Sequence, residues 1–496
     1  MRLAVFIFTF FVFFVNSFCN PLLAASALKP QHASRLPQKT LALPRIFGDH
    51  MVLQRGKPIR IWGWGGPNTT ITVKLKNREC NTRALNNGTW LLEFPSQKAG
   101  GPYTMTVTDG KQTISFMDVL IGEVWLCSGQ SNMEFTLDNP KKYHGLSVKN
   151  AKEEVAKAKY PKIRLFKVKR AKSLTPKYDF QAGEWQLCTP ESASDFSATA
   201  YFFGRKLFQA LNIPVGLIQS AWGGSSCQAW NSNDTIKNFP NYKAALKNNP
   251  KGIMKQGPYP KGPTILYNAM IQPLIPYVIA GFIWYQGEAN RWRAKEYTKL
   301  FPAMIKDWRG KFKQGDIPFF YCQIAPFAYK TKEAGVKMRE AQREVMSSLP
   351  NLGMVVLNDK TDIKLIHPPY KKAAGERLAG WALNKVYGKK VPYSGPLFKN
   401  FKADSRGNVT VFFEYADGLK GSADAFELAG SNGVFHKAKG KIKGNTVVLN
   451  SNEVKKPKAV RYAWSNVATG GLFNKYGLPT SSFTSAEWND KPPGNK

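Results

Sequence analysis

The sequence predicts an α/β protein in which a three-layer α/β/α domain with a parallel sheet lies between two β-rich, sandwich-like modules. Two observations predict this architecture. Near-continuous apolar runs in the middle of the chain alternate with helical patterns, as expected for parallel strands covered by helices on both faces. Short strand-like runs separated by turn signals occupy both ends of the 496-residue chain, whose length is typical of several domains.

Residues 1–27 predict a cleavable signal peptide. Arg2 precedes a largely apolar run from Leu3 to Val15, and Ala25 and Ala27 supply the small residues of a cleavage site. An uncleaved anchor is the alternative, but the run is shorter than the roughly 20 residues that a spanning helix needs. Residues 28–41 lack periodicity and predict a flexible leader. We therefore expect a secreted or periplasmic protein with no transmembrane segment after cleavage.

The two β-rich modules are predicted over residues 42–118 and 394–496. The first contains "PIRIWGWGG", "TTITVKLK", "TWLLEF", "YTMTV" and "TISFMDV", and the second contains "NVTVFFEY", "AFELAG", "TVVLN" and "AVRYAWS". Strands of this length at this spacing are typical of small antiparallel sandwiches. The modules would either bind carbohydrate or brace the central domain, and bracing is favoured because neither shows a run of aromatic residues with an exposed pattern.

The central domain is predicted over residues 119–393. Its apolar runs are "EVWLCSG", "VGLIQSAWGG", "GFIWYQGE", "PFFYCQIAP" and "GMVVLND". The helical patterns with the clearest spacing cover residues 337–349 and 370–387. A less regular helical pattern, over residues 196–211, follows a long irregular insertion after Ser131.

The chain is strongly basic, with 71 lysine and arginine residues, 33 aspartate and glutamate residues and a net charge of +38. Such a charge favours association with polyanions such as acidic polysaccharide, anionic surfaces or nucleic acid. The lysines are spread along the whole chain, and no basic and aromatic residues interleave as in a nucleic-acid-binding motif, so no dedicated nucleic-acid site is predicted. The cysteines are too widely spaced for a disulfide framework or a structural zinc motif, and one or two disulfides stay open as an alternative.

Polar residues follow the predicted parallel strands at their carboxyl ends, where ligands gather in such sheets. They lie after the first strand (Ser131), the second (Gly223, Gly224), the third (Gln286, Gly287, Glu288) and the fifth (Asp359, Asp362, His367). We expect these residues to share one edge of the sheet.

Ser131 is the candidate nucleophile and His367 the candidate base, because a serine hydroxyl needs a base that takes its proton near neutral pH. Among the five histidines, only His367 combines the end of a strand with the start of a helix, and His144 in the insertion is the weaker rival. The alternative for Ser131 is a turn or cap residue, and for His367 a helix-entry residue. Cys127 lies within an apolar run and is interpreted as a buried core thiol.

An ester-cleaving site also needs donors for the oxyanion. Candidate donors are the NH of Ser131, the backbone NH groups at Gly223 and Gly224, and the amide of Gln286, with ordinary loop turning as the alternative for the glycines. Other candidates for substrate contacts are Gln130, Asn132, Glu288 and Trp222. Aromatic residues that would either stack on sugar rings or pack in the core are Trp222, Trp230, Trp284, Tyr285 and Trp292.

Four ordered blocks, "GEVWLCSGQSNMEF", "PVGLIQSAWGGSSCQAW", "WYQGEAN" and "IHPPYKKAAGERLAGWAL", resemble the sialate O-acetylesterase family of SGNH-type hydrolases. The likeness extends from "LPRIFGDHMVLQRGKPIRIWGWG" to "VRYAWSN". It implies an SGNH-hydrolase-like catalytic domain, a catalytic Ser131 and His367, and an oxyanion hole formed by Ser131, Gly224 and Gln286. The implied reaction removes O-acetyl groups from sugars through an acetyl-serine intermediate. No metal or organic cofactor is expected.

The chain departs from the family pattern at the acidic member of the triad. SGNH enzymes commonly carry an aspartate three residues before the histidine, where this chain has Lys364, and similar proteins often read "DIHP" where this chain has Leu365. Asp362 is the first candidate for the acid because it lies in the same short loop. Asp359, Glu288 and a Ser-His pair assisted by a backbone carbonyl are the alternatives.

The natural substrate stays open at this point, because similar secreted proteins deacetylate sialic acid, xylan or other decorated glycans. Two other functions compete with an esterase. A glycan-binding protein that has lost catalysis would explain the missing aspartate, and polyanion or nucleic-acid binding would explain the charge.

Overall fold

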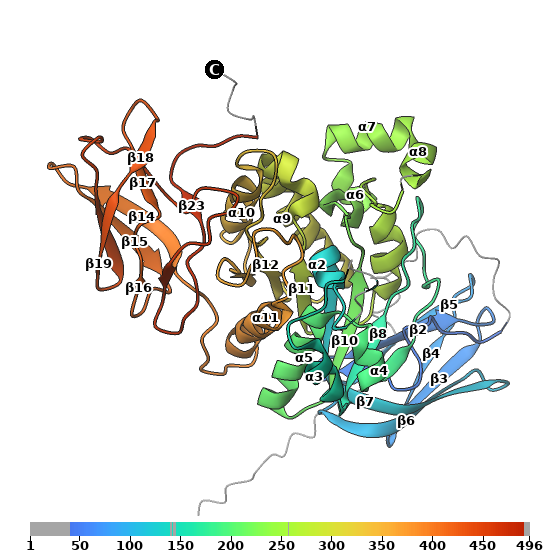
Figure 1. The fold of residues 1–496 in the computed structure, drawn as a ribbon. Helices are drawn as coiled ribbons and strands as arrows, with labels where there is room; N and C mark the ends of the chain where they lie inside the picture. Colours follow the sequence, from blue (N-terminus) through green and yellow to red (C-terminus); the bar gives the residue numbers. More distant parts are fainter. Residues whose placement is uncertain (1–39, 139–140, 142–144, 256, 491–496) are drawn as a thin grey trace, which may run out of the picture.

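The computed structural model describes residues 40–138, 141, 145–255 and 257–490 and is drawn in Figure 1. The predicted signal peptide, residues 28–39 of the predicted leader and the histidines His32 and His144 lie outside this part of the chain. Figure 1 shows a central sheet with helices, flanked by the blue N-terminal strands and the orange C-terminal strands. The predicted α/β/α architecture with β-rich flanking regions is confirmed.

Four N-terminal strands, β1, β3, β4 and β6, belong to the same 11-stranded sheet as the central strands, whereas β2 and β5 pair with each other in a separate sheet. The connection is β7 (Thr113–Gly129), whose first half pairs with β6 and whose second half pairs with β10 and β11. The boundary expected between residues 118 and 119 falls inside this strand, so the division into separate domains stays a proposal. The other strands of this region are β1 (Val52–Gln54), β2 (Ile59–Trp64), β3 (Thr70–Leu75), β4 (Arg78–Arg83), β5 (Thr89–Phe94) and β6 (Gly100–Thr108).

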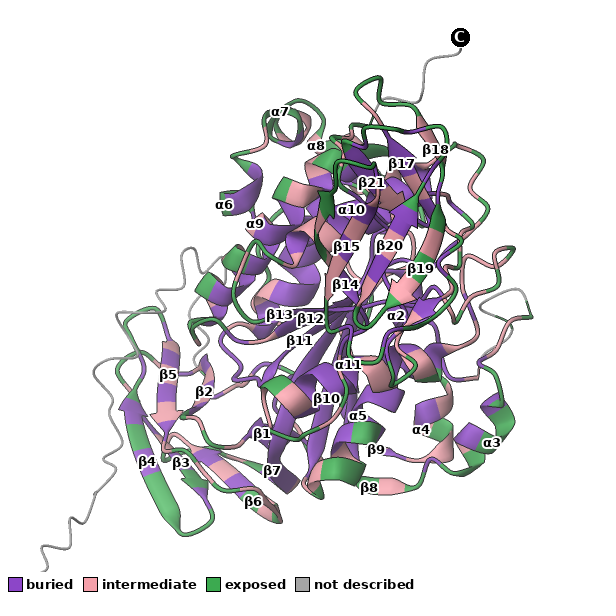
Figure 2. Ribbon diagram, turned by 90° about the vertical axis from the view of Figure 1, so that its left-hand side faces the viewer, coloured by how far each residue is buried: buried purple, intermediate pink, exposed green. Residues whose placement is uncertain are grey.

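The central strands run in the order β13-β12-β11-β7-β10-β8-β9, and all neighbours are parallel except β8 and β9. The five apolar runs of the sequence form β7 and four strands whose residues are all buried, as Figure 2 shows. Their bounds, and those of the two strands from the insertion after Ser131, are β8 (Tyr160–Lys167), β9 (Trp185–Cys188), β10 (Val215–Ala221), β11 (Gly281–Tyr285), β12 (Phe319–Cys322) and β13 (Leu352–Val355).

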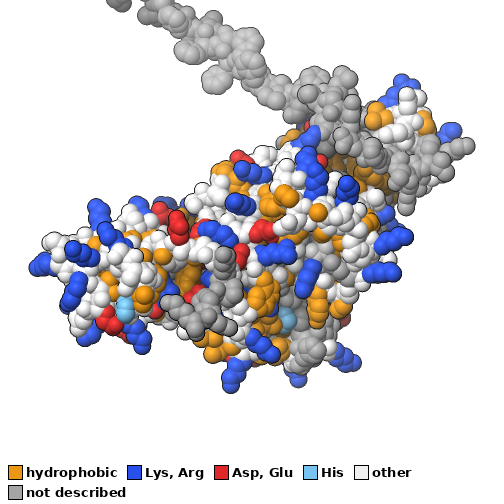
Figure 3. Space-filling view, turned by 90° about the horizontal axis from the view of Figure 1, so that it is seen from above, with side chains coloured by type: hydrophobic (Ala, Val, Ile, Leu, Met, Phe, Trp, Pro, Cys, Tyr) orange, Lys and Arg blue, Asp and Glu red, His pale blue; other side chains and the backbone are white. Residues whose placement is uncertain are grey.

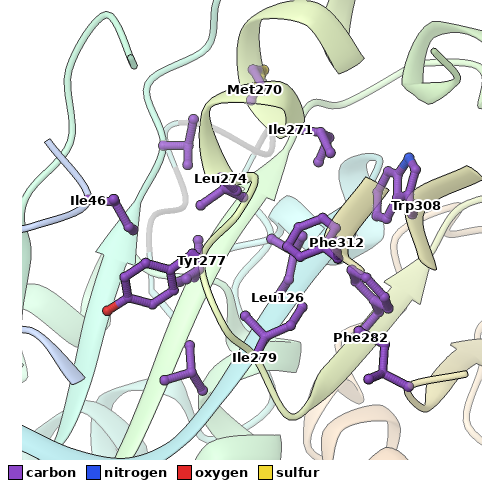
Figure 4. Close-up of a cluster of buried hydrophobic side chains, with 14 of the residues drawn as sticks. Ile46, Leu126, Met270, Ile271, Leu274, Tyr277, Ile279, Phe282, Trp308 and Phe312 are labelled. Carbon is purple, nitrogen blue, oxygen red and sulfur yellow. The ribbon is translucent and has the colours of Figure 1, made fainter. Parts of the chain in front are cut away.

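All residues of β10 to β13 are buried, and consecutive side chains of a strand point to opposite sides of a sheet. Both faces of this sheet are therefore buried. On one face, Leu126 of β7 and Phe282 of β11 pack with Trp308 and Phe312, as Figure 4 shows. On the other face, the Trp125 ring of β7 packs against helix α5. The sheet therefore forms the middle layer of three.

The helices α9 and α10 cover the first face, and α5 and α11 cover the second. Helix α5 begins after Ser197, whose hydroxyl accepts the NH of Ala200 at 3.1 Å. The helices are α2 (Ser131–Glu134), α3 (Ala151–Ala156), α4 (Pro190–Ser194), α5 (Ala198–Leu211), α6 (Asn233–Ile236), α7 (Pro240–Asn248), α8 (Pro250–Lys255), α9 (Ala294–Phe312), α10 (Ala334–Val345) and α11 (Lys371–Lys385). Shorter helical turns are η2 (Cys227–Trp230), η3 (Tyr267–Ile271), η4 (Gln272–Leu274) and η5 (Glu288–Arg293).

The C-terminal strands form two four-stranded sheets, β14-β15-β20-β19 and β18-β17-β21-β23, around their own apolar core, together with the pair β16-β22. Buried Arg339 of α10 anchors this region because its guanidinium donates to the Ser482 hydroxyl at 3.1 Å and to the Ser465 carbonyl at 2.5 Å. The strands are β14 (Leu397–Ala403), β15 (Val409–Glu414), β16 (Lys420–Gly421), β17 (Phe426–Ala429), β18 (Phe435–Lys437), β19 (Lys439–Lys443), β20 (Thr446–Asn450), β21 (Ala459–Tyr462), β22 (Leu472–Phe473) and β23 (Phe483–Thr484).

Candidate active site

Ser131 is the first residue of α2 and follows the carboxyl end of β7, as the sequence predicts. The chain turns there at Gly129, whose φ of +140° and close approach to β11 require glycine, since a Cβ would lie 2.2 Å from the Tyr285 carbonyl oxygen. The NH of Gln130 donates to that carbonyl at 2.9 Å. The turn thereby fixes the half-buried Ser131 at the edge of the sheet.

The glycine pair after β10 lies beside Ser131. A Cβ built on Gly223 would be 3.4 Å from the Cβ of Ser131, and the NH of Gly223 donates to Glu134 at 2.9 Å. Gly224 has a φ of +70°, and its NH makes no hydrogen bond within the described part of the chain. The NH of Ser131 has no acceptor inside α2 because Ser131 is its first residue. These two NH groups are therefore available as oxyanion donors.

His367 lies in the loop between β13 and α11, and its ring is 6.2 Å from that of Phe135, the residue after α2. The Asn132 amide nitrogen donates to the Ile366 carbonyl at 3.1 Å across 234 positions of sequence. The residue after Ser131 is thus bonded to the residue before His367. The described histidines outside this loop, His50 and His436, pair with Asp118 at 2.7 Å and with Glu453 at 2.5 Å.

The three candidate carboxylates have different surroundings. Asp362 is exposed, and one of its oxygens accepts the NH of Lys364 at 2.9 Å within the same loop. Asp359 makes a bidentate pair with Arg377, with both distances 2.7 Å. Both side chains therefore have local partners, and neither makes a hydrogen bond to Asn132 or to the 366–368 backbone among the described residues.

Glu288 is the candidate carboxylate that joins the cluster around Ser131. Its Oε1 accepts the Asn132 amide at 2.6 Å, while its Oε2 is buried and has no hydrogen-bond partner among the described residues. Burial raises the pKa of the Glu288 carboxyl, and the hydrogen bond from Asn132 opposes this shift. Among the three candidate carboxylates, Glu288 is thus the one that bonds to the residue next to Ser131.

Gln286 and Gln130 hold loops in place. The Gln286 amide nitrogen donates to the Ser225 carbonyl at 3.2 Å and to Asn290 Oδ1 at 2.7 Å, so both of its N–H groups are used. The side-chain oxygen of Gln130 accepts the NH groups of Gly287 and Ala289 at 3.3 and 3.2 Å. In this arrangement Gln286 supports the loop that carries Gly224 and has no N–H left for an oxyanion.

Lys371, the first residue of α11, belongs to the cluster and was missed by the sequence analysis. Its ammonium group donates to Asn132 Oδ1 at 2.6 Å and to the Pro368 carbonyl at 2.8 Å. Burial lowers the pKa of Lys371 to about 7, against the attraction of Glu288. A sequence signal existed, because Lys371 shares the buried face of α11 with Ala374, Gly375 and Leu378 at helical spacing.

The aromatic candidates divide between rim and core. The Trp222 side chain is half-buried and lies 5.5 Å from the guanidinium carbon of Arg170, which also pairs with Glu134 at 2.5 Å. Tyr259 is 62% exposed and packs against Gly224, so its ring is available to a sugar beside the candidate oxyanion donors. Trp292 is exposed, whereas Trp230, Trp284 and Tyr285 are core residues.

Most of these candidate site residues lie within one segment that matches a known protein family. Residues 121–383 match the family described as carbohydrate esterase, sialic acid-specific acetylesterase. Sialate O-acetylesterases of Homo sapiens and Pongo abelii are each 32% identical to this chain over 398 residues, covering 71% of this chain and 72% of the relative. The Mus musculus sialate O-acetylesterase is 30% identical over 414 residues, covering 71% of this chain and 75% of that protein.

A solved structure gives a similar result for the fold. The crystal structure of a carbohydrate acetylesterase from Xanthomonas citri superposes with a TM-score of 0.80 and 34% sequence identity, covering 90% of this chain and 100% of that chain. The similarity therefore extends over the N-terminal, central and C-terminal regions together.

Proposed function

This chain belongs to the family of sialic acid-specific carbohydrate acetylesterases, and from this premise we propose that Ser131 and His367 deacetylate acidic glycans through an acetyl-serine intermediate. The chain is a carboxylic ester hydrolase that acts on acetylated carbohydrate. The observation that carries the proposed mechanism is the hydrogen bond from Asn132, next to Ser131, to the carbonyl of Ile366, next to His367.

In the proposed reaction, His367 takes the proton of the Ser131 hydroxyl while the oxygen attacks the acetyl carbonyl carbon. The NH groups of Ser131 and Gly224 stabilise the oxyanion. When the tetrahedral intermediate collapses, the C–O bond to the sugar breaks and His367 returns its proton to the departing sugar oxygen. Water activated by His367 then hydrolyses the acetyl-serine, which releases acetate and restores both side chains.

We propose Glu288 as the carboxylate of this site in place of Asp362, because Glu288 is buried and bonded to Asn132. Replacement of Glu288 by Gln is expected to lower kcat for p-nitrophenyl acetate by about 10²- to 10³-fold, since an amide cannot stabilise the imidazolium that forms on His367. Asp362→Asn is the matched control and should stay within about threefold of the wild type. If the two effects were reversed, Asp362 would be the acid.

We propose an anionic substrate because the protein is strongly basic. Figure 3 shows lysine and arginine side chains spread over the described part of the face seen there, with fewer acidic side chains among them. A positive field raises the rate of encounter with anionic ligands. Together with the half-exposed Trp222 and exposed Tyr259 at the rim, this charge suits an acetylated sialic acid or uronic acid.

The experiment that tests this substrate class measures acetate release from O-acetylated sialic acids, acetylated uronans and neutral acetylxylan. We expect kcat/KM to be higher for the two acidic substrates at low salt, with the difference shrinking as salt screens the charge. Ser131→Ala protein is the control for spontaneous hydrolysis. Equal values for acidic and neutral substrates at every salt concentration would contradict the role of charge.

We further propose that the protein is secreted or periplasmic, on the basis of the N-terminal signal in the sequence. Among the helices of residues 40–490 that are described, none has the length and apolar character needed to cross a membrane.

A further inference from the structure

We propose that Lys371 is a positioning residue of this active site, which fastens the segment of Ser131 to the segment of His367 through Asn132 and the Pro368 carbonyl. The proposal rests on the proposed function, because it assigns the two catalytic side chains to those segments. It concerns a side chain that would touch neither the substrate nor the reacting atoms.

Asn132 is 1% exposed, and its side-chain amide has a hydrogen-bond partner on each side. Its Oδ1 accepts from Lys371, and its Nδ2 donates to Glu288 at 2.6 Å and to the Ile366 carbonyl at 3.1 Å. An ammonium group can only donate, and an ionised carboxylate and a carbonyl oxygen can only accept. The partners therefore allow a single orientation of the Asn132 amide, and Lys371 is the partner that fixes its oxygen.

The loop before α11 is held by the same lysine. The same ammonium group donates to the Pro368 carbonyl, one residue after His367, at 2.8 Å. With the bond from Asn132 to Ile366, one residue before His367, the loop is held on both sides of the histidine. Small displacements of a base relative to its nucleophile are costly in rate, so these two bonds bear directly on catalysis.

Burying the Lys371 ammonium group costs folding free energy. Lys371 is 1% exposed, and no acidic group pairs directly with its ammonium group in the described part of the chain. Its surroundings are the rings of Phe135 and Tyr285, at 4.8 and 5.7 Å, and the opposing charge of Glu288 beyond the Asn132 amide. A buried charge without a direct partner is unfavourable for folding, whereas an apolar side chain would suit this face of α11. The lysine therefore requires a reason other than stability.

The experiment compares Lys371→Met and Lys371→Arg with Lys372→Met as the matched control. Lys372 is the next residue of α11, with a side chain 52% exposed that contacts Glu154 at 3.2 Å, away from the cluster. For p-nitrophenyl acetate we expect Lys371→Met to lower kcat about 100-fold, with KM changed less than about threefold, because geometry and not substrate binding is lost. Lys371→Arg, which keeps the charge, should recover part of kcat. Lys372→Met should resemble the wild type.

The pH profile provides a readout that a purely structural role would not change. The titratable groups that act on Lys371 are Glu288 on η5 and the Cys322 thiol on β12, and Tyr285 presents its ring from β11. The pKa of Lys371 is lowered to about 7, so its ammonium form is present below that pH and is lost above it. We expect kcat/KM of the wild type to fall on the alkaline side, and this fall to move to higher pH in Lys371→Arg, whose side chain stays charged.

The results of these experiments separate the role of Lys371 from the mechanism of Ser131. A folded Lys371→Met protein with wild-type kcat and pH profile would overturn the positioning role while leaving the esterase mechanism untouched. The same would hold if all three lysine variants lost activity equally, or if KM rose while kcat stayed constant. Full activity of Ser131→Ala would instead contradict the proposed mechanism itself. If Lys371→Met fails to fold, the kcat and pH profile of Lys371→Arg decide the matter.

Discussion

Replacing Ser131 by alanine is expected to reduce hydrolysis of p-nitrophenyl acetate by about 10⁴-fold or more, because no other group in the cluster offers a comparable nucleophile. The change removes one hydroxyl from a half-buried position in α2 and leaves the turn at Gly129 and the bonds of Asn132 in place. We therefore expect the melting temperature to change by no more than a few degrees. The rate is measured after subtraction of spontaneous hydrolysis.

A covalent probe separates loss of the nucleophile from damage to the site. A fluorophosphonate should add one label to the wild-type protein, as seen by intact mass, and none to Ser131→Ala. Ser347→Ala, which alters an exposed serine after α10, should be labelled like the wild type. Labelling of the Ser131→Ala protein at an equal rate would mean that another residue attacks the substrate.

His367→Ala is expected to lower kcat by about 10³- to 10⁴-fold, because the serine hydroxyl then has no base to accept its proton. Added imidazole should restore part of the rate if the space left by the ring admits it. His50→Ala and His436→Ala are the matched controls, since both histidines pair with carboxylates outside the site. If either control lost activity as severely as His367→Ala with the fold intact, the assignment of the base would be wrong.

The strands of the central sheet could be predicted from the sequence because each is marked by its own run of apolar residues. Runs such as 281–285 and 319–322 are apolar at every position, and a strand that is buried on both faces requires that pattern. The insertion after Ser131 was expected to be irregular, yet it supplies β8 and the edge strand β9. Lys162 and Arg164 interrupt the apolar residues of β8, so its pairing with β10 depends on contacts that its own composition does not reveal.

The sequence predicted those residues of the candidate site whose position depends only on their following the end of a strand. Ser131 and Gly223 follow adjacent parallel strands, and the structure brings them side by side. The choice among carboxylates was different, because proximity to His367 along the chain favoured Asp362. Only the tertiary fold shows that Asp362 faces solvent and that Glu288 bonds to Asn132. Contacts over such separations depend on packing, which one sequence does not specify.

The strand β7 joins the N-terminal β-rich region directly to the turn that carries Ser131. Its 17 residues begin in the N-terminal sheet and end two residues before Ser131. Removing the residues that precede it would strip β6 and β1 from the strand and leave unpaired backbone groups on the segment that leads to the nucleophile. A truncated catalytic fragment would thus lack part of its own scaffold. We expect the two regions to unfold together in a single cooperative transition, as one folding unit.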